Sequence, residues 1–575
     1  MVKKIRPWHL INTSVRNPFR LRSGLEALKE AGFLGNLGKN TEEEVAKALD
    51  RAGVITLSPT TKDITSISRK WRGALMKMGF IWGDPATRKT LLEEERGQLG
   101  APYSLTPCGE ALLAASTFEA QQEVYLRSIV ALQLPSPFDR SYKMPPFSPL
   151  SFILNVMLGL EEIGEEPFIS RLEMASIVSL RSPESDMDSL LREIIDLRER
   201  RLLSPAKRSF DTKQMKSLAD GGGYAPGTYY DYQDVTFRYL KATGLFHSCG
   251  RGITIAPEKS YIAKAISKQP VPDLTSFEYQ SRLAKGATLP TDDLEGASKS
   301  LEQVSSIAKS RGITVVLDDF DLSNVQGVNN ARFSLENAIR ENRELEFSLL
   351  QPEMGEEILA YLKALSSGKP VSYGEDLEAI IPGNERAAYF EWVLWRIILA
   401  FNHLVIPSSK VRHFNIDQDL LPISTASGGG SDVFAEYAAH ALVVEVTLTE
   451  NSRQEAAEGE PVRRHVADVF NRFRDDRKVV YGLFVARKID TNTAETFRVG
   501  RWYLPGDERI DLDIIPLTID QLTVVVETAF AKNSLEPGFL LSLLEKCARD
   551  TSRSVGAPEW KESISSIVDK LPLAS

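Results

Sequence analysis

Two carboxylates in the last third of the chain stand where a strand hairpin would bring them together. Residues 431–449 read SDVFAEYAAHALVVEVTLT, and Glu445 interrupts the apolar run ALVVEVTL. A buried carboxylate is costly unless a cation, a hydrogen-bonded partner or a raised pKa accompanies it. We expect a short strand at DVFAEY, a tight turn at Ala438–Ala439 and a buried strand at 441–448. This hairpin would place Asp432 and Glu445 close to one cation.

The ligands that this hairpin offers are oxygen atoms. Asp432, Glu445 and the main-chain carbonyl of Val446 suit a hard ion such as Mg²⁺ or Mn²⁺. Such an ion lowers the pKa of a bound water and neutralises charge at a scissile phosphate, so the chemistry indicated is phosphodiester hydrolysis. The alternative is structural: a salt bridge between Glu445 and a nearby arginine.

Further polar residues follow the hairpin. Glu458 precedes a helix that we expect over 461–476, and Arg463, Arg464 and His465 lie in its opening turns. The histidine could assist proton transfer or bind a phosphate, while the two arginines would hold a DNA backbone. A purely structural histidine is the alternative.

The elements around the hairpin predict an α/β module. The segment 384–404 has apolar residues at helical spacing and predicts an amphipathic helix. Glu391 lies on or beside its apolar stripe, either as a site residue or as an acid whose head reaches water. Residues 478–487, KVVYGLFVAR, are apolar enough for another central strand. The predicted order is helix, strand hairpin, helix, strand and then further helix.

Bulk properties place the chain among soluble, cytoplasmic, multidomain proteins. With 575 residues, it is too long for one hydrophobic core, and we expect three or four domains. No apolar run reaches the roughly 18 residues of a membrane span, and no signal-peptide core follows the basic N-terminus. The cysteines Cys108, Cys249 and Cys547 are too scattered for a disulfide framework or a zinc site.

The net charge of −9 is unevenly distributed. Residues 1–270 hold 37 Lys and Arg against 31 Asp and Glu, whereas residues 271–575 hold 32 against 47. A basic half joined to an acidic half favours polyanion binding by the first half. A solvated surface explains the excess of +6 about as well.

Turn-rich stretches divide the chain into four parts. We expect two recognition modules over 1–145 and 146–272, a helical linker over 273–371 and a final module over 372–575. ADGGGYAPGTYY, residues 219–230, is expected to be a loop inside the second module.

Both early modules are interpreted as winged-helix-like. The first runs from a helix, ITSISRKWRGALMK, into an apolar strand, with Thr106 and Pro107 starting the next helix. The second has a helix that stops at Gly244, then a strand, a turn at Gly250–Gly252 and a strand. Two small α+β packing units are the alternative. Basic residues on these elements would be the DNA contacts, namely Lys70, Arg72, Lys77, Arg238, Lys241 and Arg251.

The N-terminal segment TSVRNPFRLRSGLEALKE offers a further group of candidate DNA contacts. Asn17-Pro18 is a helix-start signal, so the basic residues around it could surround a helix N-terminus, a favourable place for phosphate. A solvated basic arm is the alternative. The candidates are Arg16, Asn17, Arg20 and Arg22.

The order of the acids resembles the PD-(D/E)XK nuclease fold, in which an acid-bearing helix precedes Asp and then Glu-x-Lys on the next strand. Here the element is Glu445-Val446-Thr447, with threonine in place of the usual lysine. TSVRNPFRL, YFEWVLW, the SDVFAEY…VVEVTLT hairpin and EGEPVRRHV resemble, in this order, the AlwI-like family of type IIS restriction endonucleases and related site-specific nicking endonucleases. Relatives also have threonine after Glu-Val, so Thr447 fits the family. WRGALMKMGFIW and TFRYLKATGLF look like family elements as well.

The resemblance implies a C-terminal α/β PD-(D/E)XK domain with a central mixed sheet, behind α+β recognition modules and a helical linker. By it, Asp432, Glu445 and the Val446 carbonyl would bind the metal, and Glu391, Glu458 and His465 would complete the site. The substrate would be duplex DNA with an asymmetric site such as GGATC or GAGTC, cut a few nucleotides outside it. Cutting both strands would need a second subunit or a transient dimer, and a cognate DNA methyltransferase would be a functional partner, not a physical one.

Two other functions fit the same patterns. A transcriptional regulator with two winged helices and a non-catalytic C-terminal module would need no metal and no acid at Glu445. A repair or recombination nuclease of the same fold would recognise DNA structure instead of sequence.

Overall fold

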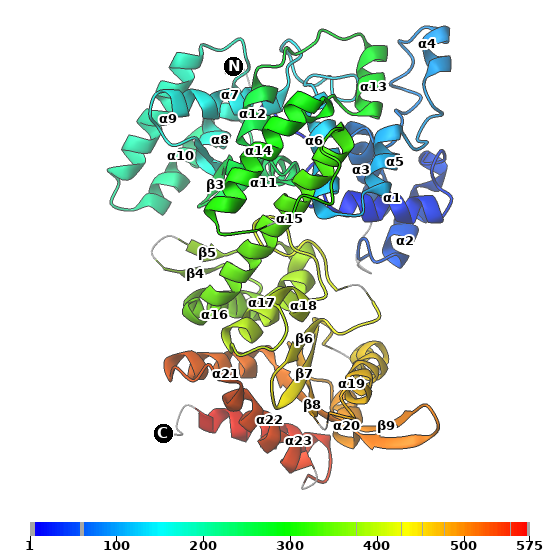
Figure 1. Ribbon diagram of the computed structural model, residues 1–575, viewed down its shortest axis with the longest axis vertical. Coiled ribbons are helices and arrows are strands. Elements are labelled where there is room, and N and C mark those ends of the chain that lie inside the picture. The colour runs from blue at the N-terminus through cyan, green and yellow to red at the C-terminus, as the bar shows by residue number, and fades with distance from the viewer. Residues whose placement is uncertain are drawn as a thin grey trace. The chain divides into compact units, whose positions relative to one another are not determined.

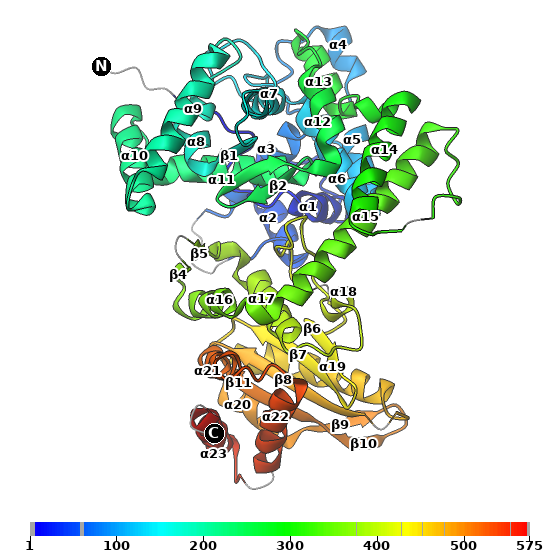
Figure 2. The ribbon, with the colours of Figure 1, turned by 60° about the vertical axis from the view of Figure 1, so that its left-hand side comes forward.

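The chain forms two compact units, Met1–Arg340 and Glu341–Ser575, and each has its own hydrophobic core. Figures 1 and 2 show their elements in a computed structural model. The sequence-based division into four parts stays a prediction. The structure describes residues 6–57, 63–314, 316–374, 377–426, 428–450, 452–476, 478–551 and 554–571.

The first part of unit 1 is helical. Its helices are α1 (Arg20–Glu30), α2 (Glu42–Arg51), α3 (Thr65–Lys77), α4 (Glu93–Gln98), α5 (Pro107–Ala114) and α6 (Phe118–Ala131). Thr106 caps α5 by accepting a hydrogen bond from Gly109 N, with Pro107 in the first turn, as predicted. The apolar strand expected after α3 is reduced to one bridge between Ile81 and Leu105. Gly79 and Gly83 lie on either side of Ile81, and glycine weakens a strand interior, which agrees with this short pairing.

The second part of unit 1 contains a small antiparallel sheet. The elements are α7 (Pro149–Glu162), β1 (Phe168–Ser170), α8 (Arg171–Ser176), α9 (Met187–Leu202), α10 (Lys207–Gly222), α11 (Pro226–Ala242), β2 (Phe246–Cys249), β3 (Gly252–Ile255) and α12 (Ser260–Ser267). The strand order is β1-β3-β2, with both pairs antiparallel. The predicted helix stop at Gly244 and the β2–β3 hairpin are confirmed, whereas β1 was not predicted.

The loop predicted over residues 219–230 is wrong, because both flanking helices extend into it. Helix α10 continues to Gly222 and ends where Gly223 adopts a left-handed conformation with φ of +74°. A Cβ on Gly222 would lie 2.0 Å from the Tyr229 hydroxyl oxygen, so the close approach of α10 and α11 requires glycine there.

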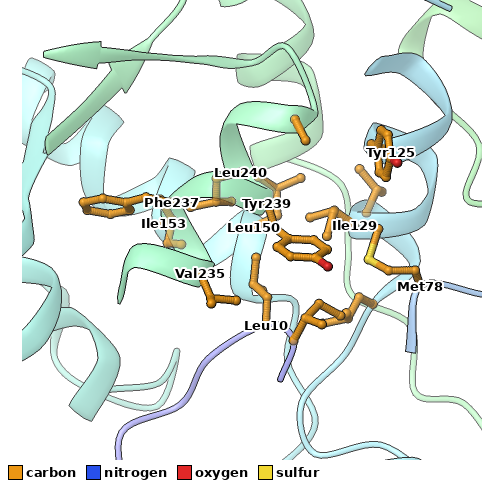
Figure 3. Close-up of a cluster of buried hydrophobic side chains, with 14 of the residues drawn as sticks. Leu10, Met78, Tyr125, Ile129, Leu150, Ile153, Val235, Phe237, Tyr239 and Leu240 are labelled. Carbon is orange, nitrogen blue, oxygen red and sulfur yellow. The ribbon is translucent and has the colours of Figure 1, made fainter. Parts of the chain in front are cut away.

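Helix α11 is packed into the core of unit 1. Figure 3 shows Val235, Phe237, Tyr239 and Leu240 among side chains from other segments of this unit, including Leu10. The N-terminal segment is also part of this core, since Trp8, Leu10, Ile11 and Val15 are buried. The alternative of a solvated N-terminal arm is therefore wrong: apolar residues between the polar ones anchor the segment.

Helices dominate residues 275–367, as predicted. They are α13 (Ser276–Lys285), α14 (Leu294–Ser310), α15 (Val325–Leu350) and α16 (Gly355–Ser367). The unit boundary falls within α15, after Arg340. None of the helices in the described part of the chain has the length and apolar character needed to cross a membrane.

Unit 2 is built on a four-stranded mixed sheet of order β11-β8-β7-β6. Strands β6 (Val433–Glu436) and β7 (His440–Thr447) are antiparallel, while β7, β8 (Val479–Ala486) and β11 (Asp513–Thr518) are parallel. Figure 2 shows them side by side. The predicted hairpin and the predicted strand over 478–487 are confirmed.

The remaining elements of unit 2 surround this sheet. Helices α17 (Arg386–Ala400) and α19 (Glu460–Arg472) both contact β7. The others are β4 (Val371–Tyr373), β5 (Leu377–Ala379), α18 (Ser408–Val411), α20 (Thr491–Val499), β9 (Arg501–Leu504), β10 (Glu508–Asp511), α21 (Ile519–Ala531), α22 (Pro537–Thr551) and α23 (Ala557–Lys570).

Two expectations for unit 2 are corrected. The segment after β8 was predicted to contain only helices, but it also contains the β9–β10 hairpin and the strand β11. Pro516 argues against a central strand, but β11 is an edge strand, where the missing N–H is tolerated. Helix α17 is not amphipathic, since every residue of 388–400 is buried, including Glu391 and Arg396.

Candidate active site

The β6–β7 hairpin sets Asp432 opposite Glu445. The register pairs Val433 with Val444, and continuing it one step beyond β6 brings Asp432 across from Glu445. One carboxylate oxygen of Asp432, Oδ2, accepts a hydrogen bond from Val446 N at 2.8 Å. The turn is closed by Tyr437 N donating to the His440 carbonyl at 2.9 Å. Backbone pairing therefore brings these two acids together.

Burial and neighbouring acids raise the pKa of both carboxyls. Glu445 is 8 % exposed, and burial, followed by the charge of Glu458, raises its pKa to about 8. Burial and the charge of Glu445 raise the pKa of Asp432 well above its usual value. Burial and a neighbouring like charge both oppose ionisation of a carboxyl group. A bound cation would therefore stabilise the ionised form of both acids.

His465 is the hydrogen-bonding partner of Glu445. Its Nδ1 lies 2.6 Å from Glu445 Oε1, and the side chain comes from the second turn of α19. Burial and the nearby charge of Arg464 lower the pKa of His465, which favours the neutral imidazole. Within the described residues, no lysine or arginine forms an ion pair with Glu445, so the predicted alternative of an arginine salt bridge is not found.

Glu391 reaches the same acids from α17. It is 5 % exposed, and its Oε2 accepts a hydrogen bond from Ala426 N at 2.7 Å. Burial, followed by the charge of Asp432, raises the pKa of Glu391 to about 9. The alternative prediction, that the carboxylate of Glu391 reaches water, is wrong, because α17 is buried on all sides.

Glu458 is placed by an irregular turn that precedes α19. Residues Glu455–Gly459 form a short π-helix, a conformation common at functional sites. Burial raises the pKa of Glu458, while a hydrogen bond from Thr447 opposes the shift. The predicted acids therefore come from four elements: α17, the start of the hairpin, β7 and the π-helix.

A buried glutamine that sequence reasoning missed fixes this turn. Gln454 is fully buried, and its Nε2 donates to the carbonyls of Thr449 at 2.6 Å and Lys488 at 2.9 Å. Its Oε1 accepts from Asp490 N at 2.9 Å. These bonds join the segments that follow the parallel strands β7 and β8. The polar run NSRQEAAEGE gave no sign that one member is buried.

The donor set fits a hard cation held partly by water. In the described part of the chain, no three His, Cys, Asp or Glu side chains group closely enough to hold a metal by themselves. Two opposed carboxylates and the carbonyl of Val446 nevertheless offer oxygen ligands, and Mg²⁺ usually keeps several waters. Burial, followed by the charge of a neighbouring acid, raises the pKa of Asp432 and of Glu445, so a cation would favour their ionised forms.

Several predicted DNA contacts on the N-terminal segment and α3 have partners within the protein. Arg16 pairs with Asp231 at 2.5 Å, Arg22 donates to the Leu112 carbonyl at 3.3 Å, and Asn17 is buried. Arg72 and Lys77 pair with Glu42 at 3.2 Å and Asp139 at 2.7 Å. Lys70 is exposed, and Arg20 is the first residue of α1. Their role in DNA binding stays a prediction.

The other predicted contacts belong to α11, the β2–β3 turn and α19. Arg238 pairs with Asp234 at 3.0 Å, Lys241 donates to Ser248 Oγ at 3.1 Å, and Arg251 lies 3.9 Å from Asp211. Arg463 stacks over Trp502, and Arg464 pairs with Glu460 at 3.2 Å. Arg16 and Arg238, 222 positions apart, meet beside Asp234.

Comparison with known proteins identifies the family. The profile of the AlwI restriction endonuclease family matches residues 76–525. Two solved structures are similar over parts of the chain. The small subunit (R.BspD6I2) of the heterodimeric restriction endonuclease R.BspD6I is 24 % identical, with 37 % of this chain and 96 % of that chain covered and a TM-score of 0.28. The BpuJ1 endonuclease binding domain, solved with pyrene- and phenanthrene-modified DNA, is 12 % identical, with 49 % and 95 % covered and a TM-score of 0.30.

No curated protein matches the chain. The family match spans both units and includes the β6–β7 hairpin, the π-helix and α19, so it covers the acids described above. The resemblance seen in the sequence is confirmed: this chain belongs to the AlwI restriction endonuclease family.

Proposed function

We propose that this protein is a type IIS restriction endonuclease that requires Mg²⁺ or Mn²⁺. It binds a short asymmetric duplex site of the GGATC or GAGTC kind and hydrolyses phosphodiester bonds a few nucleotides outside it. Family membership makes the chain a nuclease and argues against a non-catalytic regulator. The observation that carries the proposal is Asp432 lying opposite Glu445, with the pKa of both carboxyls raised.

The proposed roles of the site residues follow from their positions. Asp432, Glu445 and the Val446 carbonyl hold the ion, and Glu391 and Glu458 support a second one. A bound ion lowers the pKa of a water and neutralises charge at the scissile phosphate. His465 orients Glu445 through its Nδ1, and its ring can accept a proton because the lowered pKa keeps it neutral.

Two separate units support cleavage outside the recognised sequence. Unit 1 contains the basic N-terminal half, and unit 2 carries the carboxylates proposed for cleavage. Phosphate contacts would position the enzyme, and a few contacts to base edges would select the site. An acidic cleavage unit has little affinity of its own for DNA, so recognition by unit 1 must precede cutting.

Residues 149–255 support a winged-helix reader. The order α7-β1-α8, then α11-β2-β3, with α9 and α10 inserted, is that of a winged helix-turn-helix. In this interpretation α11 is the helix presented to the major groove, and the β2–β3 hairpin is the wing.

Plasmid digestion tests the proposed function. The wild type should cut at fixed positions beside one short sequence with Mg²⁺ and not with EDTA. Asp432→Asn and Glu445→Gln should reduce cleavage by several orders of magnitude and leave DNA binding intact. Glu436→Gln is the matched control, because Glu436 lies on β6 but pairs with Lys478 at 2.7 Å.

Sequencing the ends of both product strands completes the test. It gives the recognised bases and the cut distance, and it separates nicking of one strand from cleavage of two. Cutting by Asp432→Asn at the wild-type rate would refute the assignment of the site. Products with no common sequence would favour a nuclease that recognises DNA structure.

A further inference from the structure

One carboxylate on the outer face of α11, Asp234, lies within ion-pair distance of arginines from three separate segments. Asp234 Oδ2 is 3.0 Å from Arg238 Nε and 3.6 Å from Arg16 Nη1, and Oδ1 is 3.5 Å from Arg171 Nη2. Arg16 also donates to Asp231 at 2.5 Å. Arg171 is the first residue of α8 and was not among the residues predicted to contact DNA.

The backbone that carries these arginines is fixed. Asp231, Asp234 and Arg238 share one face of α11, since they are spaced by three and four residues, while Val235 and Phe237 point into the core (Figure 3). The hydroxyl of Tyr239 donates to the Val15 carbonyl at 3.0 Å, directly before Arg16.

The neighbouring residues hold the cluster from two further sides. The Tyr125 hydroxyl donates to the Pro18 carbonyl at 2.6 Å, which fixes the segment after Arg16. The N–H of Arg171 donates to the Arg251 carbonyl at 2.9 Å, which ties the start of α8 to the β2–β3 turn. Tertiary contacts therefore hold the backbone from which the arginines extend, and the ion pairs with Asp234 orient the guanidinium groups.

The side chain of Asp234 is less exposed than those of its three arginine partners. The Asp234 side chain is 17 % exposed, whereas those of Arg16, Arg238 and Arg171 are 29 %, 21 % and 47 % exposed. Part of each arginine side chain, most of all that of Arg171, is therefore open to a ligand.

A carboxylate in this position is unfavourable for simple phosphate binding, because it repels the DNA backbone and reduces the local positive charge. It is useful where the direction of a guanidinium matters. Arginine recognises guanine through two parallel hydrogen bonds to O6 and N7, and a partner that restrains the fork makes this geometry specific.

We propose that Asp234 is a specificity-determining positioning residue, which orients Arg16, Arg171 and Arg238 so that guanidinium groups read base edges in duplex DNA. This inference rests on the proposed function, in which unit 1 recognises a DNA sequence. It adds Arg171 to the recognition surface. It also makes an acidic residue, not a basic one, the residue that determines sequence specificity.

The decisive experiment measures selectivity without cleavage. The full chain is incubated in EDTA with a pool of duplexes carrying ten randomised base pairs. The bound DNA is then quantified and sequenced. The variant Asp234→Asn is compared with the control Asp196→Asn, which removes an acid from the exposed ion pair of Asp196 with Arg200 on α9. Thermal unfolding confirms that both variants are folded.

We expect Asp234→Asn to affect the amount of DNA bound and the sequence selectivity differently. Total DNA bound should stay level or rise, because a negative charge is lost, while enrichment of at least one base position should fall by about tenfold or more. Asp196→Asn should keep the complete motif. Enrichment by Asp234→Asn equal to the wild type, or a loss that is uniform over all sequences, would overturn the inference.

A second pair of variants keeps the test independent of the folding of Asp234→Asn. Arg171→Gln should lose preference at one position, while Arg200→Gln, changed at a similarly exposed arginine, should not. A uniform weakening by Arg171→Gln with a smaller salt dependence would mean phosphate binding and would contradict the base-reading role. A wild type that enriches no motif would refute the proposed function itself, which is a distinguishable result.

Discussion

Replacing Glu445 by glutamine should make the metal-free protein more stable at alkaline pH. Glutamine has nearly the same shape and can still accept the hydrogen bond from His465, but it carries no charge. In the wild type, burial and the charge of Glu458 raise the pKa of Glu445 from 4.5 to about 8. The folded protein therefore resists an ionisation that the unfolded chain undergoes freely.

The sign and size of the effect follow from linkage. Below pH 4.5 the carboxyl is protonated in both states and contributes no penalty. Between pH 4.5 and 8 the unfolded chain has released its proton and the folded protein has not, so stability falls by about 1.4 kcal/mol per pH unit. Above pH 8 the penalty is constant at roughly 5 kcal/mol, the largest value that this shift allows.

Thermal unfolding in EDTA, followed from pH 5 to pH 9, measures this difference. Unit 2 has the size at which 1 kcal/mol corresponds to about 2–4 °C, so the full penalty would make Glu445→Gln unfold about 10–20 °C above the wild type at pH 9. At pH 5 the two curves should nearly coincide. Adding Mg²⁺ at pH 9 should raise the unfolding temperature of the wild type and leave that of the variant almost unchanged.

Glu436→Gln is again the control, because this acid pairs with Lys478 and its removal should not stabilise the protein. Parallel stability curves for the wild type and Glu445→Gln in EDTA would refute the reasoning. They would mean that Glu445 ionises in the folded protein without penalty, and that no unbalanced charge awaits a cation.

Two further predictions concern stability. Gln454→Leu should destabilise unit 2 by several kcal/mol, because the carbonyls of Thr449 and Lys488 and the N–H of Asp490 lose a buried partner worth about 1–3 kcal/mol each; urea unfolding measures it. Gly24→Ala should destabilise unit 1 by about 1–3 kcal/mol, since the new methyl would lie 2.2 Å from the Trp71 ring, whereas Gly73→Ala, with only a 3.8 Å contact, should be neutral or stabilising.

The hairpin and its acids were predictable because local signals agree. Alternation of side chains in a strand, a short turn and a polar residue inside an apolar run together place Asp432 near Glu445, and the register confirms that they are opposite. The helix expected over 461–476 is α19, which begins at Glu460, has Pro461 in its first turn and ends at Arg472.

The surroundings of Glu391 were not predictable, because they depend on packing between distant segments. An apolar stripe indicates which face of α17 is buried but not that other elements cover the rest of it. The same limit applies to Asp234: its partners at 16 and 171 lie far away in the sequence, and no spacing connects them. Strand β11 was also not predicted, since only the strand order shows that a segment with Pro516 can lie at the sheet edge.

The charge of Asp234 in unit 1 and that of the acids in unit 2 are balanced in different ways. This difference agrees with the proposed roles of unit 1 in recognition and unit 2 in cleavage. In unit 1, Asp234 has arginine partners from the protein itself, so its charge is neutralised before DNA arrives. In unit 2, Asp432 and Glu445 face each other and Glu391, with only a largely neutral histidine beside them. Without an ion, burial and the neighbouring acids favour the protonated carboxyls, whereas a divalent ion would favour their ionised forms and would neutralise charge at a DNA backbone brought to the site. Under the proposed function, cleavage therefore needs both an ion in unit 2 and DNA held by unit 1, and neither condition by itself is sufficient.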